Sequence, residues 1–277
     1  MGKLEGKTAF ITGAARGQGR AHALALAAEG ADVFAVDVCA DIETVPYALG
    51  TKHELDETGR LVRELGRRCE SAVVDVRDAP AVDAAVAATI DVFGKVDICV
   101  ANAAVCAFGK TWELSDEMWN AVIDTNLSGV FKTLRAVTPH MVERGRGRIV
   151  AISSGAGRTG VPNLSHYVSS KWGVIGLVKS LALEVAMHGV TVNAICPATV
   201  DTPMVHNEAF YGLFAPDVQR PERAGVKDRY AAMNPMSVPW MDATDISHAL
   251  LYLVSDEARY VSGSALEVSA GGAALKP

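Results

Sequence analysis

Residues 7–19 read KTAFITGAARGQG, and this stretch decides the fold. The apolar run from Lys7 to Thr12 predicts a buried parallel strand, because strands covered on both faces lack polar alternation. A glycine turn follows, and alanine and leucine then recur at helical spacing to Glu29. Strand, glycine turn and helix in this order favour a dinucleotide site, since glycines let the backbone approach a pyrophosphate and a helix N-terminus offers free N–H groups. The candidate contacts in the turn are Gly13, Arg16, Gln18 and Gly19.

The alternation of strand and helix continues along the whole chain. Apolar runs predict further strands at residues 31–36, 71–74, 96–101, 148–153, 190–196 and 265–268. Helical patterns are expected at residues 53–66, 79–93, 116–143 and 243–255, and another helix ends near His188. This order predicts a single doubly wound α/β domain of the Rossmann type over residues 1–277, with a parallel sheet of about seven strands and helices on both faces.

Composition excludes several classes of protein. Of 277 residues, 49% are hydrophobic, which suits one domain with a sizeable core. The net charge of −6 includes no basic block, so neither nucleic acid nor a membrane is an expected partner. We find no N-terminal signal pattern and no apolar run of about 18 residues. Five dispersed cysteines favour free thiols in a reducing cytoplasm, and the seven histidines lack metal-site spacing, so no metal is expected.

The second predicted strand is followed by Asp37, about 20 residues after the glycine turn. A carboxylate there accepts hydrogen bonds from the adenosine ribose and repels a 2′-phosphate, which favours NAD over NADP. Arg16 is a contrary signal because it could bind that phosphate, and Asp37 could instead be a solvated loop acid. Residues 38–52, with Pro46 and Gly50, are expected to form a long loop near the adenosine. Further cofactor contacts are expected from Val38, Asp75, Val76, Asn102, Ala103 and Ala104.

A tyrosine and a lysine lie four residues apart after the fifth predicted strand. Tyr167 and Lys171 share one helix face, about 6 Å apart along its axis, so the ammonium is expected to lower the pKa of the tyrosine. Ser154 lies at the end of that strand, where open α/β sheets bind ligands. Its hydroxyl could hold a substrate oxygen against the phenol, which predicts proton transfer to or from an alcohol or ketone. The alternative is a chance pair on an amphipathic helix.

These motifs together resemble the short-chain dehydrogenase/reductase family over nearly the full chain. The glycine motif TGxxxGxG spans residues 12–19, and the other family positions match Asn126, Ser154, Tyr167 and Lys171. Ser154 precedes Tyr167 by the family spacing, so the neighbouring Ser153 is expected to have a packing role. Two glycines usual in the family are alanine here, at Ala104 and Ala198, which removes no chemical group.

The resemblance implies a role for each catalytic position. Tyr167 would be the general base for the hydroxyl proton as hydride moves to nicotinamide C4. Lys171 would lower the Tyr167 pKa and bind the nicotinamide ribose. Ser154 would orient the substrate oxygen, and Asn126 would hold a water that links Lys171 to solvent. The implied cofactor contacts also include Tyr167, Lys171, Pro197, Val200 and Thr202.

The loop at residues 38–52 is longer than in most members of the family. It resembles the insertion of the mycofactocin-associated, carveol dehydrogenase-like subgroup. That likeness implies an insertion over the cofactor, NAD held tightly and exchanged poorly, and electrons leaving through a redox peptide. The family also implies a homotetramer built through the long helices that carry Asn126 and Tyr167.

Residues 203–240 are expected to form a lid over the substrate. Aromatic and apolar residues are frequent there, which predicts a secondary alcohol on a bulky apolar, cyclic skeleton. The likeness to the carveol dehydrogenase-like subgroup implies a terpenoid, carveol-like alcohol or ketone. The expected pocket residues are Val105, Phe108, Trp112, Met204, Phe210, Tyr211, Leu213, Phe214, Met233, Met236 and Trp240. The alternative is that these side chains form the core of the lid or a subunit interface.

Two rival functions remain open. An NADPH-dependent ketoreductase of acyl-type substrates would share the catalytic set, although Asp37 and the acidic balance oppose it. A non-catalytic NAD-binding regulator would share the fold, although the intact set from Asn126 to Lys171 opposes it.

Overall fold

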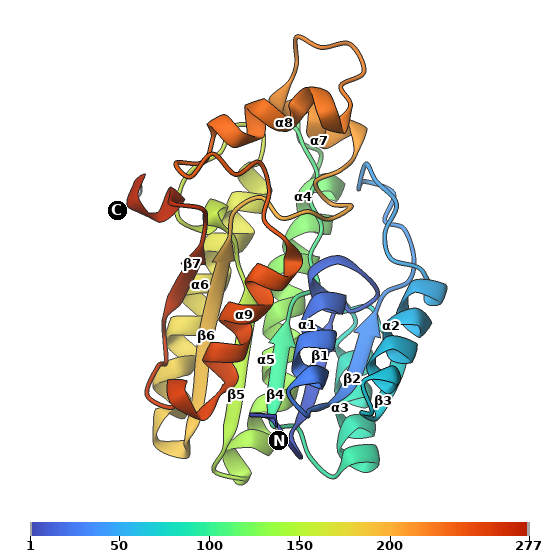
Figure 1. Ribbon diagram of the computed structural model, residues 1–277, viewed down its shortest axis with the longest axis vertical. Helices are drawn as coiled ribbons and strands as arrows, with labels where there is room; N and C mark the ends of the chain where they lie inside the picture. Colours follow the sequence, from blue (N-terminus) through green and yellow to red (C-terminus); the bar gives the residue numbers. More distant parts are fainter. Residues whose placement is uncertain (1, 276–277) are drawn as a thin grey trace.

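The computed structural model describes residues 2–275, which contain one parallel sheet of seven strands (Figure 1). The strand order is β3-β2-β1-β4-β5-β6-β7. It reverses between β1 and β4, and ligands bind such sheets where the strands on either side of the reversal end. The predicted doubly wound sheet is therefore confirmed. The strands are β1 (Thr8–Thr12), β2 (Asp32–Asp37), β3 (Cys69–Val73), β4 (Ile98–Ala101), β5 (Gly147–Ile152), β6 (Val190–Pro197) and β7 (Ala265–Val268).

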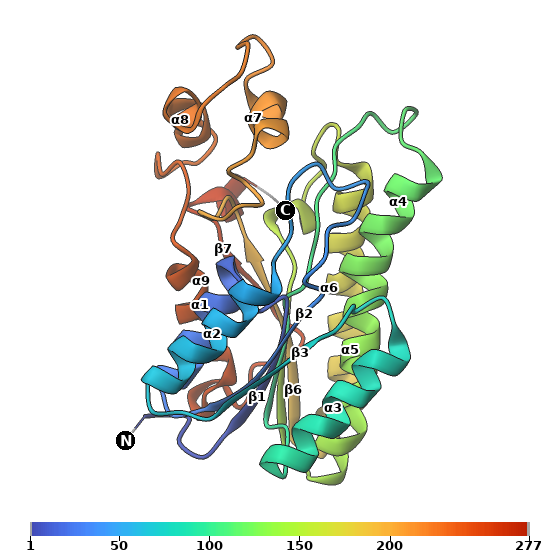
Figure 2. The ribbon, with the colours of Figure 1, turned by 90° about the vertical axis from the view of Figure 1, so that its right-hand side faces the viewer.

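Helices cover both faces of the sheet (Figure 2). Successive strand residues point to opposite faces, so Ile11 packs with the cluster under α1, α2 and α9, while Phe10 packs with the cluster under α3, α5 and α6. Both clusters are fully buried apolar cores, which explains the continuous apolar strands. These helices are α1 (Gly17–Ala28), α2 (Lys52–Glu64), α3 (Ala79–Phe93), α5 (Gly129–Glu143), α6 (Ser165–Val185) and α9 (Ala243–Val254).

The helix expected over residues 116–143 contains a π turn. The chain forms α4 (Asp116–Ile123), then the π turn (Asp124–Ser128), then α5. Ser115 caps α4 by accepting a hydrogen bond from the Met118 amide at 3.2 Å. Pro139 lies inside α5 and does not separate its last turn. Single π turns are frequent at functional sites, and this one contains the buried Asn126.

Two segments lie beyond the carboxyl ends of the strands. Residues 38–52, the insertion, connect β2 to the start of α2, and residues 203–240, the lid, contain α7 (Glu208–Phe214) and α8 (Arg223–Ala232). Figure 1 shows both segments at the same end of the sheet. Connecting segments of this kind can shape a ligand site without disturbing the core.

Two further features concern the cysteines and the length of the helices. All five cysteines are free, and four of them are buried. Within residues 2–275, no helix is long and apolar enough to cross a membrane.

A buried histidine lies where α1 packs against α9. His22 is fully buried, and its Nδ1 lies 2.8 Å from the hydroxyl of Ser247. Its Nε2 is buried and has no hydrogen-bond partner among the described residues. Burial therefore lowers the pKa of His22 from 6.5 to about 3.

We expect the free energy of unfolding to fall as pH drops from 6.5 toward 3, because the unfolded chain binds a proton at His22 that the folded chain excludes. His22→Leu removes this proton uptake, so the dependence of stability on pH should become shallower by about 1.4 kcal/mol per pH unit. Urea denaturation at a series of pH values measures it, with His53→Leu at an exposed position as the control. Equal slopes for wild type and His22→Leu would contradict the assignment.

Candidate active site

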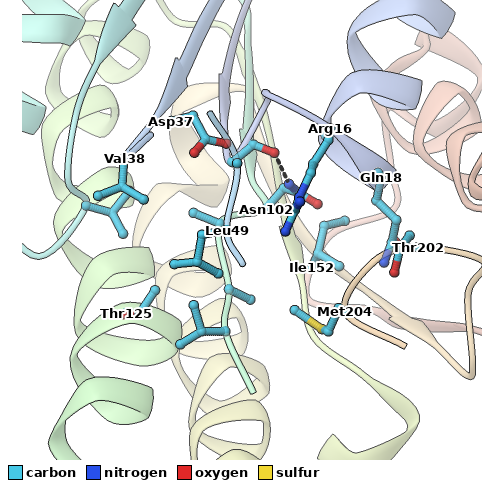
Figure 3. A pocket seen from close by; sticks show the side chains of 18 of the residues that line it. Arg16, Gln18, Asp37, Val38, Leu49, Asn102, Thr125, Ile152, Thr202 and Met204 are labelled. Atoms are coloured by element: carbon cyan, nitrogen blue, oxygen red, sulfur yellow. Dashed lines mark hydrogen bonds between the residues drawn. The ribbon is translucent and has the colours of Figure 1, made fainter. Parts of the chain in front are cut away.

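A cleft lies at the carboxyl ends of β1, β2, β4 and β5 (Figure 3). It encloses about 1030 Å³ of space, counted out through its open mouth into solvent. Most of the sequence-predicted cofactor residues line it together. They are Gly13, Arg16, Gln18, Gly19, Asp37, Val38, Asp75, Val76, Asn102, Ala103, Ala104, Tyr167, Lys171 and Thr202.

The glycine turn brings the start of α1 against the end of β1. Gly13 has a φ of +67°, and a Cβ on Gly19 would lie 2.0 Å from the carbonyl oxygen of Gly13. Asn102 holds this turn by donating from Nδ2 to the carbonyls of Thr12 at 2.9 Å and Gly13 at 3.1 Å. No side chain caps the N-terminus of α1, so its first N–H groups face the cleft. This cradle fits the pyrophosphate of a dinucleotide.

Asp37 is held at the cleft by two backbone amides. Its Oδ2 accepts from Ala15 N–H at 3.0 Å, and its Oδ1 accepts from Cys39 N–H at 3.2 Å. The carboxylate is therefore fixed at the end of β2, as required for a ribose contact. Arg16 donates a hydrogen bond to the carbonyl of Ala48 in the insertion. This contact gives Arg16 a role other than phosphate binding and weakens it as a signal for NADP.

The insertion reaches further than the adenosine end, which the sequence did not predict. The hydroxyl of Tyr47 accepts a hydrogen bond from the Cys106 amide at 3.0 Å, in the loop after β4. An apolar cluster surrounds this contact and joins the insertion to α4 and α6. It contains Val45, Leu49, Val105, Ala107 and Val122, with Tyr47 and Tyr167 packed against it. The apolar residues at every second position from Val45 to Leu49 were a usable signal of one packed face.

Ser154, Tyr167 and Lys171 lie together where β5 ends and α6 begins. The Ser154 hydroxyl forms a hydrogen bond with the side chain of Tyr167 and also accepts one from the Ala156 amide at 3.1 Å. Lys171 donates from Nζ to the carbonyl of Ile152 at 2.9 Å. The same Nζ lies 5.5 Å from the centre of the Tyr167 ring. The structure therefore assembles a hydroxyl, a phenol and an amine at one wall of the cleft.

The predicted lowering of the Tyr167 pKa is wrong for this arrangement. Burial raises the pKa of Tyr167 well above 10, and the nearby Cys106 raises it further, whereas the hydrogen bond with Ser154 lowers it. Loss of hydration of the phenolate is the largest effect. Lys171 faces the tyrosine ring and the Ile152 carbonyl, and burial lowers the pKa of Lys171 to about 8. Helical spacing predicted that the two groups lie close but not how deeply they are buried.

Asn126 lies behind the cleft and does not line it. Its side-chain amide pairs with the backbone of Val105, donating to the carbonyl and accepting from the N–H, both at 2.8 Å. Its Nδ2 also lies 3.3 Å from the hydroxyl of Ser170. These partners explain why a polar side chain is stable inside this helix. Ser153 donates to the carbonyl of Lys171 at 2.9 Å and so holds the α6 backbone.

Between β6 and the lid, the chain contributes Thr202 to the cleft wall. Thr202 lines the cleft, and Figure 3 shows it beside Gln18. A Cβ on Gly17 would lie 3.2 Å from the Thr202 methyl, so this segment packs closely on the glycine turn. Pro197 ends β6, and Val200 forms an isolated bridge with Met241; neither lines the cleft.

The lid residues divide between the cleft and the lid's own core. Met204 lines the cleft (Figure 3), whereas most of the lid aromatics pack on one another, as the alternative predicted. Phe108 contacts the lid by an edge-to-face pair with Phe210, with ring centres 5.4 Å apart. Trp112 is 80% exposed, so its predicted place in the pocket is wrong. The lid core contains Phe210, Tyr211, Phe214, Tyr230 and Trp240.

The comparison with known families agrees with this geometry. The sequence profile described as short chain dehydrogenase matches residues 7–209. The chain belongs to this family, and the predicted membership is confirmed.

Individual relatives are similar over the whole chain. It is 45% identical to the (-)-trans-carveol dehydrogenase of Rhodococcus erythropolis, with 98% of this chain and 99% of the relative covered. Carveol dehydrogenase from Mycobacterium avium, solved in complex with NAD, is 46% identical with a TM-score of 0.97, covering 99% and 100% of the two chains. Levodione reductase is 31% identical with a TM-score of 0.87, covering 98% and 99%. The predicted resemblance to carveol dehydrogenases is thus confirmed.

Gly19→Ala should destabilise the fold by roughly 1–3 kcal/mol or more, because the added methyl meets the Gly13 carbonyl and neither backbone can yield. Chemical denaturation measures the loss. Gly176→Ala is the matched control, since this exposed glycine of α6 has open space around it and alanine there should stabilise the helix by about 0.5–1 kcal/mol. Equal stability of Gly19→Ala and wild type would contradict the close contact.

Proposed function

We propose that this chain transfers a hydride between NAD and a secondary alcohol or ketone on an apolar, cyclic skeleton. The observation that carries the proposal is the hydrogen-bonded pair of Ser154 and Tyr167, with Lys171 beside it, at one wall of the cleft that the predicted cofactor residues line. Two of the relatives are named for carveol, which is a cyclic terpenoid alcohol. The chain is an NAD-dependent alcohol dehydrogenase/reductase, and its substrate class is the new part of the proposal.

The residues that would hold NAD are those that meet in the cleft. The glycine turn and the start of α1 would hold the pyrophosphate, and Asp37 would accept hydrogen bonds from the adenosine ribose. Figure 3 shows Asp37 and Met204 at opposite sides of the cleft, so the residues near Met204 and Lys171 would hold the nicotinamide end. NAD, when bound, supplies the ring that accepts or donates the hydride.

Three side chains share the proton chemistry. Tyr167 takes the hydroxyl proton of the alcohol, or returns it to the ketone in the reverse direction. Ser154, already hydrogen-bonded to Tyr167, holds the substrate oxygen beside that phenol. Because burial raises the pKa of Tyr167, the base form needs a positive charge nearby, and Lys171 supplies one below about pH 8.

Asn126 is a positioning residue in this proposal. Its amide fixes Val105 in the loop that borders Tyr167, and its place in the π turn suits the water link that the family resemblance implies. Its hydrogen-bond partners among the described residues are Val105 and Ser170, not Lys171.

The contacts of the insertion support tight retention of NAD. Arg16 holds Ala48 at the glycine turn, and Tyr47 holds Cys106 across the cleft, so the insertion is attached on both sides of the space for the dinucleotide. We infer slow exchange of NAD and a redox peptide as electron acceptor. NAD(H) released when the purified protein is denatured supports retention, and protein purified without nucleotide would argue against it.

Exposed apolar side chains and free cysteines bear on the assembly and the location of the protein. Large apolar side chains are exposed on the long helices, namely Trp119, Phe131, Trp172 and Leu183. We infer that they meet in a homotetramer, which light scattering tests by the mass in solution. The free cysteines support a reducing cytoplasm.

One relative supports the rival activity. The chain is 37% identical to a putative ketoacyl reductase of Streptomyces coelicolor, with 98% of each chain covered. Acyl substrates would enter the same cleft and use the same Tyr167. The position of Asp37 and the Arg16 contact favour NAD over NADPH and so oppose this alternative.

Tyr167→Phe should lower kcat for a cyclic secondary alcohol by about 10²–10⁴-fold, because it removes the proton acceptor and leaves the ring packing intact. A panel of cyclic and acyclic alcohols, assayed with an artificial electron acceptor with and without added NAD, measures turnover and substrate class together. Tyr252→Phe at an exposed position is the control. Normal turnover by Tyr167→Phe would sink the assignment, and failure of every cyclic alcohol would remove the substrate class.

Asp37→Ala should weaken binding of NAD and admit NADP, because the ribose loses its acceptor and the 2′-phosphate loses a repelling charge. Loss of hydrogen bonds between the ribose and the charged carboxylate should change the ratio of the affinities for NAD and NADP by about tenfold or more. Equilibrium dialysis over several days, which allows for slow exchange, measures both. A wild type that already prefers NADP would contradict the role of Asp37.

A further inference from the structure

The loop after β4 is held by three separate parts of the protein. Val105 is fixed from the core by the amide of Asn126, and Cys106 is fixed from the insertion by the hydroxyl of Tyr47. Phe108 contacts Phe210 of the lid. Residues 105–108 therefore form a wall whose position depends on the core, the insertion and the lid together.

A further hydrogen bond ties the end of this wall to the approach to α6. The Gly109 amide donates to the Asn163 carbonyl at 3.0 Å, two residues before α6 begins. Tyr167 lies in the first turn of α6 and packs against the apolar cluster that contains Val105 and Ala107. The wall thus borders the phenol on which the proposed chemistry depends.

Tyr47 is the side chain by which the insertion reaches this wall. It lines the cleft and shares the apolar cluster with Tyr167. Its hydroxyl accepts from the buried Cys106, so the position of the ring is set by a directional contact as well as by packing. Burial raises its pKa far above 10, so it remains a neutral phenol. A neutral aromatic side chain at this position suits contact with an apolar skeleton.

We propose that Tyr47 is a specificity-determining residue of the alcohol site, acting by positioning residues 105–108 against Tyr167. The inference rests on the proposed function, because it concerns the alcohol that binds beside Tyr167. It gives the insertion a second task. The Arg16 contact with Ala48 attaches the insertion over the cofactor, whereas the Tyr47 contact with Cys106 shapes the space for the substrate.

Tyr47→Phe tests the proposal because it removes the hydroxyl and keeps the ring. The Cys106 amide then loses its partner, and we expect KM for a bulky cyclic secondary alcohol to rise about tenfold relative to propan-2-ol, the effect of one lost neutral hydrogen bond. NAD retained per chain should stay as in the wild type. Steady-state kinetics with both alcohols and nucleotide content after denaturation give the two readouts.

Arg16→Ala is the contrasting variant, because it releases the insertion at its other contact. We expect it to retain less NAD while the ratio of kcat/KM for the two alcohols stays unchanged. Tyr260→Phe, at a side chain that is 89% exposed, controls for the substitution itself. A Tyr47→Phe enzyme with unaltered selectivity would overturn the proposal, and equal loss for both alcohols with loss of NAD would assign Tyr47 to cofactor retention instead.

Hydrogen exchange separates this proposal from the proposed function. In Tyr47→Phe, the peptide that covers residues 105–109 should exchange faster than in the wild type, whatever the substrate is. If residues 105–109 exchange faster but the enzyme oxidises no alcohol, the role of Tyr47 in positioning the wall is supported and the proposed function is contradicted. Unchanged exchange would remove the role of Tyr47 in positioning the wall.

Discussion

The close contact between Gly13 and Gly19 is the constraint on which the site depends. It places the N-terminus of α1 directly beyond the end of β1, and Asn102 from the end of β4 holds it by hydrogen bonds to the turn. The strand order reverses between β1 and β4. These two strands are thus joined by the hydrogen bonds of Asn102 beyond their ends as well as by their pairing in the sheet. Every other segment of the cleft is placed relative to this junction, including Thr202, which packs on Gly17.

Opposite this rigid junction, the cleft is bordered by the insertion and by the lid. The insertion and the lid come from distant parts of the sequence, yet each sends an aromatic side chain to residues 105–108. Residues 105–108 therefore contact both segments, beside the apolar cluster against which Tyr167 packs.

Much of the fold and the central site was predictable from the sequence. Apolar runs and helical periodicity place the strands and most helices, because burial on both faces of a parallel sheet leaves a strong pattern. The glycine turn, Asp37 and the Ser154–Tyr167–Lys171 set are also visible, since their spacing is imposed by strand ends and one helix face. The π turn at Asp124–Ser128 was not predicted, because helical residues continue on both sides of it and the sequence was read as one helix.

What sequence reasoning missed depends on tertiary burial. The pKa of Tyr167 rises because desolvation outweighs nearby favourable groups, and spacing alone carries no information on depth. Trp112 looked like a pocket residue by its type but is exposed, and the lid aromatics pack on one another. The reach of Tyr47 to Cys106 spans 59 positions, so no local pattern could reveal it.

The separation of Tyr47 and Cys106 in the sequence also matters during synthesis of the chain. Residues 38–52 leave the ribosome before β4 and the loop after it, so the apolar Val45, Tyr47 and Leu49 have at first no surface to cover them. Alternating apolar residues of this kind can pair with other chains as an added strand. Pro46 lies within the stretch, is exposed in the folded protein and has no N–H to donate to such a ladder. A proline at this position therefore opposes pairing of the nascent stretch with another strand.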